Sequence, residues 1–217
     1  MYKLYYYPGN ANLAPHMLME EIGAPHVLVL VDRDNNAQNS AAYLKLNPSG
    51  RIPTLIDGDL VVSETAAICL HLADRHPESG MAPAIGTGER ALFYKWMLYF
   101  ANTLQAELVI YFYPERLADD DAMAAKVKIH AERRIAGMLD LIEAQLAQNA
   151  DQNAGPYLLG ATYRAVDPYL FMLARWTRMM DRPASSRAHF ADYLRLIADR
   201  PAVKRAFTAE GISAPLY

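Results

Sequence analysis

The residues best suited to hold a ligand lie in Asn47–Leu55, which read Asn-Pro-Ser-Gly-Arg-Ile-Pro-Thr-Leu. A turn containing Pro and Gly leads directly into a short apolar strand that begins at Ile52-Pro53. Proline cannot donate to a sheet, and X-Pro bonds are the only common cis peptides, so Pro53 predicts a kinked strand entry. Such an entry leaves the main-chain N–H and C=O of Ile52 free to pair with a peptide-like ligand. An ordinary turn proline explains Pro53 equally well at this point.

A second candidate for binding lies at Ser63-Glu64-Thr65, where a helix is expected to begin. The first N–H groups of a helix lack intrahelical partners, and the dipole is positive there, so this end suits a carboxylate. A plain helix cap explains the same three residues.

Cysteine chemistry is restricted by the presence of a single cysteine, Cys69. One cysteine forms no internal disulfide, no Cys-x-x-Cys redox site and no zinc cluster built on thiolates. We therefore expect no metal cofactor.

Composition predicts an ordinary soluble protein. The chain has 217 residues, of which 53% are hydrophobic, and a net charge of −3 without a long run of like charges. Nothing in this charge pattern favours nucleic acid or a membrane surface as a partner. No apolar run approaches the roughly 18 residues of a spanning helix, and the first residues do not resemble a signal peptide. We expect a cytoplasmic protein.

The organisation of the chain changes near residue 80. Before it, strand and helix signals alternate, with strands expected at 3–7, 27–31, 54–56 and 60–62 and helices at 13–22, 41–46 and from 63 to about 74. Asn12 is a plausible N-cap and Gly23 a stop for the first helix. The unbroken apolar run Val27–Val31 is typical of a strand covered on both faces. The apolar face of the 63–74 helix is expected to hold Ala67, Ile68, Cys69 and Leu72.

The remainder is predicted to be helical. Helices are expected at 89–112, from Asp119-Asp120-Asp121 onward, at 167–180, 188–197 and 201–208. In the second of these, the apolar face is predicted to contain Val127, Ala131, Ile135, Met138, Ile142 and Leu146. Asp167 is expected to cap the third, with Pro168 at its first position. The fold class is thus α+β: a mixed four-stranded sheet with helices in residues 1–78, a linker at 79–87 and an all-helical domain at 88–217.

These motifs together resemble those of the cytosolic glutathione S-transferases. The segments that carry the likeness are KLYYYPG, NPSGRIPTL, SETAAICLHLADRHP, GPYLLGATYRAVDPYLF and RPAVKRAFTAEGI, which extend over essentially the whole chain. Each motif is weak alone, but their order and spacing together are specific. The resemblance implies a thioredoxin-like N-terminal domain, an all-helical C-terminal domain and a homodimer. Among the classes, the chain is similar to the bacterial beta class.

The resemblance also implies a glutathione site. Ile52, before a cis-Pro53, would pair its main chain with the cysteinyl unit of the tripeptide. Glu64 would receive the ligand's ammonium group, and the Thr65 hydroxyl would donate to the γ-glutamyl carboxylate. Arg51 is placed for a carboxylate or for water.

The loop that would contact the glutathione thiol departs from the beta class. That class has a cysteine and then a serine where this chain has Ala11 and Asn12. The remaining candidates to contact the thiol are Asn12, then Tyr6, then Asn10. Each also has a simpler explanation: Asn12 as a helix cap, Tyr6 as a core aromatic and Asn10 as a turn former.

The long helix after residue 89 would form the pocket for the second substrate. Its candidate pocket residues are Tyr99, Thr103, Ala106 and Tyr111, and Asn102, Gln105 and Tyr113 lie on the same helix, which would face the cleft. Tyr111-Phe112-Tyr113 is either an apolar wall of this pocket or part of the core. The predicted activity is conjugation of the glutathione thiolate to a small hydrophobic electrophile. The alternatives are a glutathione-dependent reductase or isomerase, and a non-catalytic binding protein on the same fold.

Overall fold

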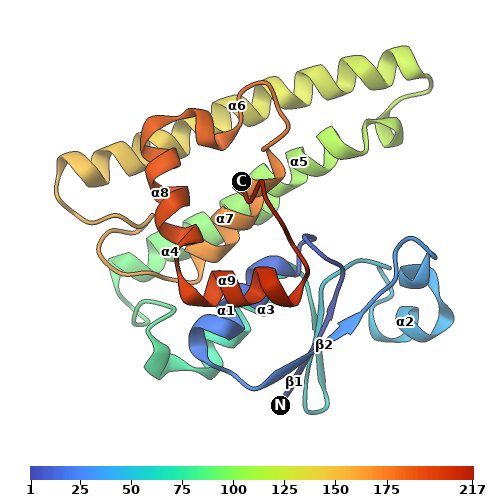
Figure 1. Cartoon of the computed structure of the whole chain (residues 1–217), viewed down its shortest axis with the longest axis horizontal. Coiled ribbons are helices and arrows are strands. Elements are labelled where there is room, and N and C mark those ends of the chain that lie inside the picture. Colours follow the sequence, from blue (N-terminus) through green and yellow to red (C-terminus); the bar gives the residue numbers. More distant parts are fainter.

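The N-terminal part of the protein is built on one mixed sheet of four strands in the order β2-β1-β3-β4 (Figure 1). The computed structural model describes residues 1–217. The strands are β1 (Tyr2–Tyr6), β2 (His26–Leu30), β3 (Thr54–Asp57) and β4 (Leu60–Ser63). β1 runs parallel to β2 and antiparallel to β3, and β3 pairs antiparallel with β4. The predicted mixed four-stranded sheet is confirmed.

The prediction that the second strand is covered on both faces is wrong. β2 lies at the edge of the sheet, and Val27 and Leu30 are 37% and 56% exposed. A continuous apolar run indicates a strand but does not establish its position in the sheet, since order depends on the crossovers between strands. The expected hairpin around Gly58 is present, with Asp57 paired to Leu60 and Gly58 at φ 61°.

Two helices pack on the sheet and against each other: α1 (Leu13–Ile22) and α3 (Thr65–Arg75). A short helix, α2 (Ala41–Leu46), lies apart from them beside β2 (Figure 1). α1 has the predicted bounds and ends at Gly23, whose φ of 72° needs a residue without a side chain. On α3 the buried apolar residues are Ile68, Cys69, Leu72 and Ala73, whereas Ala67 is exposed, contrary to the prediction.

The C-terminal part is helical, as predicted. Its helices are α4 (Gly88–Tyr99), α5 (Gln105–Phe112), α6 (Asp121–Asp151), α7 (Val166–Trp176), α8 (Ala188–Ala198) and α9 (Pro201–Ala209). The predicted single helix over 89–112 contains a π-helical turn at Phe100–Leu104, which separates α4 from α5. On α6 Leu139 is buried, whereas Val127 and Met138 of the predicted face are only partly buried.

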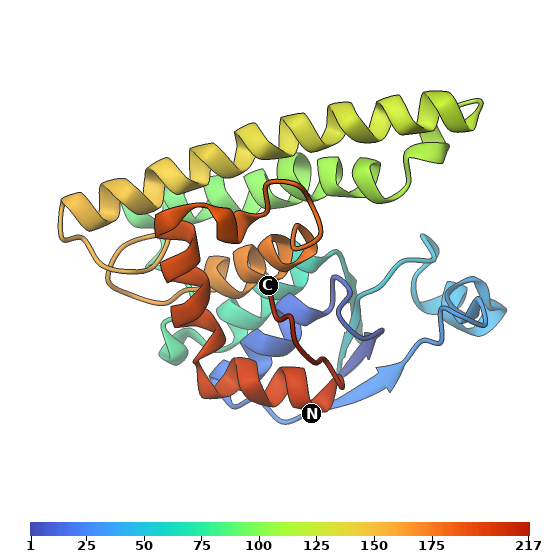
Figure 2. The same ribbon diagram turned by 45° about the horizontal axis from the view of Figure 1, so that its top comes forward.

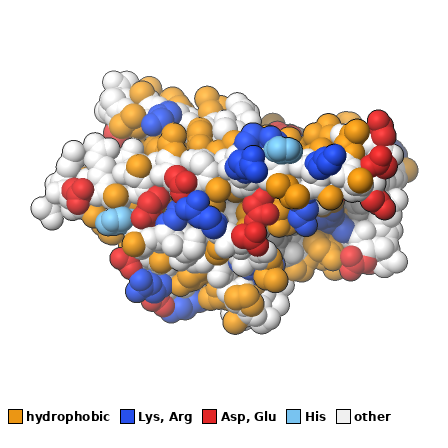
Figure 3. Space-filling model, turned by 90° about the horizontal axis from the view of Figure 1, so that it is seen from above, with side chains coloured by type: hydrophobic (Ala, Val, Ile, Leu, Met, Phe, Trp, Pro, Cys, Tyr) orange, Lys and Arg blue, Asp and Glu red, His pale blue; other side chains and the backbone are white.

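The two parts share one hydrophobic core. Met17 and Leu18 of α1 belong to the same buried cluster as Leu170 and Phe171 of α7. α9 packs against α1, so the chain returns to its N-terminal part, and Figure 2 shows α9 and the C-terminal segment beside α1. α6 lies along the side of the molecule opposite α9 (Figure 2). On the face seen in Figure 3, basic and acidic side chains are interspersed. None of the helices combines the length and the apolar character needed to cross a membrane.

Asp167 stabilises the start of α7, but it does not act as the predicted N-cap. It lies inside the helix and is fully buried, and its carboxylate accepts hydrogen bonds from the main-chain N–H groups of Arg164 (2.7 Å) and Leu158 (3.1 Å) and from the Tyr193 hydroxyl (2.9 Å). Burial raises the pKa of Asp167 to about 6. The carboxylate thus accepts hydrogen bonds from the loop before α7, and no side chain caps the start of this helix.

Replacing this carboxylate by a carboxamide should destabilise the protein. Asp167→Asn has one acceptor oxygen for two main-chain N–H groups, so the free energy of unfolding should fall by about 1–3 kcal/mol. Urea denaturation at pH 7 measures it. Asp192→Asn, at an exposed site on α8, is the control and should change stability by less than about 0.5 kcal/mol. Equal effects of the two substitutions would contradict a structural role for Asp167.

Candidate functional site

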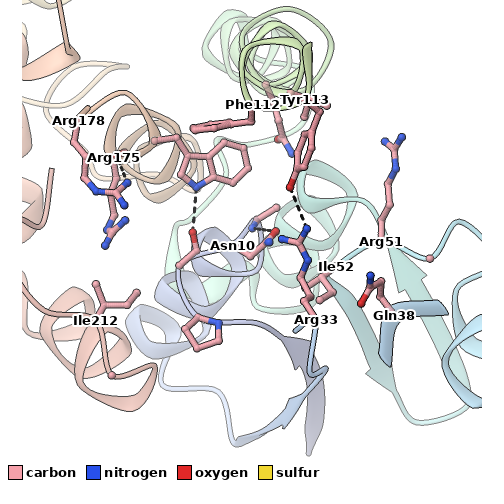
Figure 4. A pocket seen from close by; sticks show the side chains of 18 of the residues that line it. Asn10, Arg33, Gln38, Arg51, Ile52, Phe112, Tyr113, Arg175, Arg178 and Ile212 are labelled. Carbon is pink, nitrogen blue, oxygen red and sulfur yellow. Dashed lines mark hydrogen bonds between the residues drawn. The ribbon is translucent and has the colours of Figure 1, made fainter. Parts of the chain in front are cut away.

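A cavity of about 920 Å³ opens between the sheet and the helical part (Figure 4). Its wall is formed by the loop 8–11 between β1 and α1, the segment 33–39 after β2, the turn before β3, the end of α5 with Arg116 beyond it, the end of α7 with Arg178 beyond it, and the C-terminal segment 211–215. Its size is in the upper range of small-molecule sites. Five arginines line it, and no aspartate or glutamate does: Arg33, Arg51, Arg116, Arg175 and Arg178.

The turn before β3 has the geometry that its sequence predicts. The Ile52-Pro53 peptide is cis, and the main-chain N–H and C=O of Ile52 make no hydrogen bond within the protein. The Arg51 carbonyl accepts from the Tyr43 hydroxyl (2.7 Å) and from the Asn47 side chain (2.8 Å), which hold the turn from behind. Arg51 and Ile52 line the cavity, whereas Pro53 is buried beneath them.

The start of α3 lies next to the cavity, but its side chains do not line it. Glu64 is exposed and has φ 70° and ψ 121°, a conformation that costs a non-glycine residue about 1–3 kcal/mol. The Thr65 hydroxyl is buried and donates to the carbonyl of Ala11 (3.1 Å). That proton is therefore already engaged, and what Thr65 offers to a ligand is its main-chain N–H at the first turn of the helix.

A buried carboxylate from the end of α9 holds the loop between β1 and α1. Glu210 accepts from the Gly9 N–H (2.8 Å), from the Asn12 side-chain amide (2.9 Å) and from Nδ1 of His16 (2.7 Å). The side chains of Glu210 and His16 are fully buried. Sequence reasoning missed both residues, because they lie 194 positions apart and no local pattern connects them.

Asn12 is committed to this network. Besides its bond to Glu210, it accepts from the Tyr7 main-chain N–H through Oδ1 (3.1 Å), and it is fully buried. It does not cap α1, since its own backbone is helical and its side chain makes no cap. The expectation that Asn12 caps the helix is wrong, and its side chain does not line the cavity.

Of the three residues proposed from sequence to contact the thiol, only Asn10 lines the cavity (Figure 4). Its Oδ1 accepts from the Ala11 N–H (2.7 Å), and its amide NH₂ has no acceptor within the protein. Tyr6 is half-buried in the sheet and outside the lining. Of the three, Asn10 is therefore the one that lines the cavity and keeps a free N–H donor.

The helical wall agrees with the sequence expectation in part. Gln105, Phe112 and Tyr113 line the cavity together with Val109, whereas Tyr99, Thr103, Ala106 and Tyr111 do not. The π-helical turn at Phe100–Leu104 inserts an extra residue, which rotates the following helix about its axis. The spacing of a regular α-helix therefore does not predict which side chains of α5 face the cavity.

Trp176 at the end of α7 connects the helical part to the loop 8–11 between β1 and α1, which we call the binding loop. Its Nε1–H donates to the Gly9 carbonyl (3.1 Å), and its ring meets Phe112 edge to face at 6.1 Å between centroids. These two aromatic rings form the apolar part of the wall. Nothing in the local sequence distinguished Trp176 from a core residue.

Two other groups with chemical potential lie outside the cavity. Cys69 is completely buried, and burial raises the pKa of its thiol far above the usual value, so it forms no thiolate at neutral pH. Ligand atoms of His16, Glu20 and His26 lie within 4.8 Å of one another and could hold a metal ion. None of these three lines the cavity.

Comparison with known proteins identifies the class. Residues 1–74 match the family model for the glutathione S-transferase N-terminal domain. Glutathione S-transferase 3 of Zea mays is 30% identical over 98% of this chain and 96% of its own length. Glutathione S-transferase GstA of Escherichia coli O157:H7 is 26% identical over 97% of this chain and 99% of its own.

A solved structure of a glutathione transferase homologue from Sulfitobacter, with bound glutathione, superimposes with a TM-score of 0.87. It is 26% identical and covers 98% of this chain and 99% of its own. The fold is thus that of a glutathione transferase, with a thioredoxin-like N-terminal part. This chain belongs to the glutathione S-transferase family and is of the bacterial type.

The hydrogen bonds of the binding loop predict different roles for its two asparagines. Asn12→Ala should lower the free energy of unfolding by about 2–4 kcal/mol, because it leaves the Tyr7 N–H without its acceptor and removes one of the two hydrogen bonds to Oε1 of the buried Glu210. Asn10→Ala should cost less than about 1 kcal/mol, because its side chain is half-buried and makes one local bond. Chemical denaturation of both variants measures the difference. If Asn10→Ala were the more destabilising, the assignment of Asn12 to the framework would be wrong.

Proposed function

We propose that this protein binds glutathione in the cavity, stabilises its thiolate and transfers the tripeptide to a small hydrophobic electrophile. The single observation that carries the proposal is the unpaired main chain of Ile52 beside Asn10 in a cavity lined by cations and no acid. A tripeptide with two carboxylates and a cysteinyl main chain fits these groups. Family membership supports the same cosubstrate.

In the proposed complex the cysteinyl unit pairs with the main chain of Ile52. The γ-glutamyl carboxylate meets the free N–H groups at the start of α3, at Thr65, and Glu64 receives the ammonium group. Arg51, beside Ile52, is available for the glycyl carboxylate. The thiol then lies near the loop 8–11, where Asn10 offers an unused N–H donor.

One donor is sufficient to ionise the thiol at neutral pH. A free cysteine thiol has a pKa of about 8.5, and lowering it by about 2 units requires roughly 2.7 kcal/mol. A hydrogen bond to a charged group supplies about 1.5–3 kcal/mol, and the N-terminal end of α1 adds about 0.3–1 kcal/mol. An amide cannot accept a proton, so the thiol proton leaves to water.

Reduction through a protein cysteine is not supported. Cys69 is buried in the core and remains protonated, so no mixed disulfide with glutathione can form there without unfolding of α3. Conjugation requires only the thiolate and a site for the electrophile. The apolar wall of Trp176 and Phe112 beside the loop supplies that site.

Substituting Asn10 should raise the pKa of the thiol of bound glutathione. In Asn10→Ala we expect the thiol pKa to rise by about 1–2 units, the equivalent of one hydrogen bond to a charged group. Ultraviolet absorbance of the thiolate during a pH titration measures it, together with turnover of a halonitroarene. Gln148→Ala, which removes an exposed carboxamide on α6, is the control.

The proposal fails if wild-type protein binds glutathione without lowering its thiol pKa and without turnover. A rise in the pKa on Tyr6→Phe, with none on Asn10→Ala, would instead assign the contact to the Tyr6 hydroxyl.

We also propose that the protein is a homodimer. Leu92 and Leu98 on α4 are 52% and 55% exposed, and Leu60 and Val61 are exposed on the edge strand β4. Light scattering should give about twice the 24.3 kDa mass of the chain. Leu98→Glu should weaken the association by placing a charge in the contact, whereas Leu117→Glu, at an exposed site between α5 and α6, should not. A monomer in the wild type contradicts this proposal.

A further inference from the structure

Arg175 is a buried cation without an acidic partner, and its guanidinium carbon lies 5.7 Å from the centre of the Phe207 ring. It is 7% exposed, its guanidinium donates no hydrogen bond to the protein, and its Nε is completely shielded from solvent. The two other buried arginines are paired with acids: Arg90 with Asp74 at 2.8 Å and Arg187 with Asp140 at 2.7 Å. The protein thus compensates buried arginines elsewhere, and Arg175 is the exception.

No nearby acid is free to compensate Arg175. Glu210 is the acid that acts on it electrostatically, but its two oxygens bind Gly9, Asn12 and His16, and it makes no ion pair with Arg175. Burial, together with the neighbouring charge of Arg178, lowers the pKa of Arg175 to about 10. The group therefore still carries its charge at neutral pH.

Arg178 adds a second cation at the same end of the cavity. It lies three residues after Arg175, just beyond the end of α7, and its Nη1 donates to the main-chain carbonyl of Arg175 (2.9 Å), which fixes its guanidinium at this end of the helix. Neither forms an ion pair within the protein, and Figure 4 shows both guanidinium groups above Ile212. The C-terminal dipole of α7 favours cations there and compensates them in part. It does not explain why both line a cavity without any acid.

The surroundings of these two cations are apolar and aromatic. Trp176 follows Arg175 in the chain, and its ring meets that of Phe112, which is 44% exposed. Ile212 lines the same cavity and lies below the two arginines in Figure 4. A Cβ added at Gly9 would lie 3.9 Å from both Arg175 Nη1 and Ile212 Cδ1. The Arg175 guanidinium therefore lies against the loop that would hold the glutathione thiol.

Glutathione does not account for this pair of arginines. Ile52 and Arg51, which are proposed to bind its cysteinyl and glycyl units, lie at the other end of the cavity, beyond Asn10 (Figure 4). Arg33 and Arg116 are engaged with Tyr113, through its hydroxyl at 3.0 Å and its ring at 4.0 Å. Arg175 and Arg178 remain for whatever occupies the aromatic wall.

We propose that Arg175 and Arg178 bind an acidic group of the second substrate, so that the electrophile is a flat apolar molecule carrying a carboxylate, sulfonate or phosphate. Guanidinium forks bind such oxyanions through paired hydrogen bonds, and the rings of Trp176 and Phe112 suit an aromatic body. This inference rests on the proposed function and specifies its substrate class.

A matched pair of substrates tests the proposal: 4-chloro-3-nitrobenzoate and the uncharged 4-chloro-3-nitrobenzamide. In both, the glutathione sulfur forms a bond to the ring carbon, chloride leaves with the electron pair of the carbon–chlorine bond, and the thiol proton passes to water. Each kcat/KM is divided by the rate constant of the uncatalysed reaction, because the substituents differ in their activation of the ring. The wild type should then favour the benzoate by at least about tenfold.

The variants identify the residues responsible. Arg175→Met and Arg178→Gln should each reduce the preference for the benzoate about tenfold, chiefly by raising the KM for the benzoate. The kcat/KM for the benzamide should stay within about threefold of the wild-type value. Arg175→Lys, which keeps the charge but loses the fork, should retain part of the preference. Arg195→Gln, at an exposed site on α8, should leave kcat/KM for both substrates unchanged. If circular dichroism shows that Arg175→Met does not fold, Arg178→Gln and Arg175→Lys show whether the preference for the benzoate depends on these arginines.

The proposal is overturned if the wild type shows no preference, or if the preference survives in the Arg175 and Arg178 variants. Absence of turnover with both substrates would contradict the proposed function instead. Binding then tests the anion site independently, because a nitroaromatic ring quenches the fluorescence of the half-buried Trp176 on contact. Equal affinities for the benzoate and the benzamide in that titration would overturn the anion site.

Discussion

The carboxylate of Glu210 is the group on which the geometry of the site depends most. It comes from the end of the last helix, yet it accepts hydrogen bonds from Gly9, Asn12 and His16 at the start of the chain. A fully buried carboxylate is tolerated only when its oxygens are satisfied, so the loop must adopt the conformation that satisfies them. Trp176 holds the same loop from α7 through the Gly9 carbonyl.

This arrangement separates the polar groups of the loop into two sets. The inward set, with Asn12 and Glu210, is saturated and serves the framework, while Asn10 on the outward side keeps an unused donor. The same division appears among the arginines: Arg90 and Arg187 are paired within the fold, and those of the cavity are free of acids. Groups that line the cavity and have no partner within the protein are available to a ligand.

Much of the fold followed from local patterns. The bounds of α1 and α2, the hairpin at Gly58 and the cis peptide at Pro53 depend on neighbouring residues, whose types restrict the backbone directly. The position of β2 at the sheet edge and the π-helical turn after Tyr99 did not follow, because each depends on packing between distant segments. That turn rotates α5, and Gln105, Val109 and Phe112 line the cavity whereas Ala106 and Tyr111 do not.

The sequence by itself determined the family, the mixed sheet followed by helices, and the turn that exposes the Ile52 main chain. Each of these is encoded by residue types at short spacing, or by motifs in a fixed order. Only the tertiary structure decided which asparagine is free, since the role of Asn12 depends on Glu210, 198 residues away. It likewise revealed the unpaired Arg175, because burial and the lack of a partner are properties of the folded chain alone.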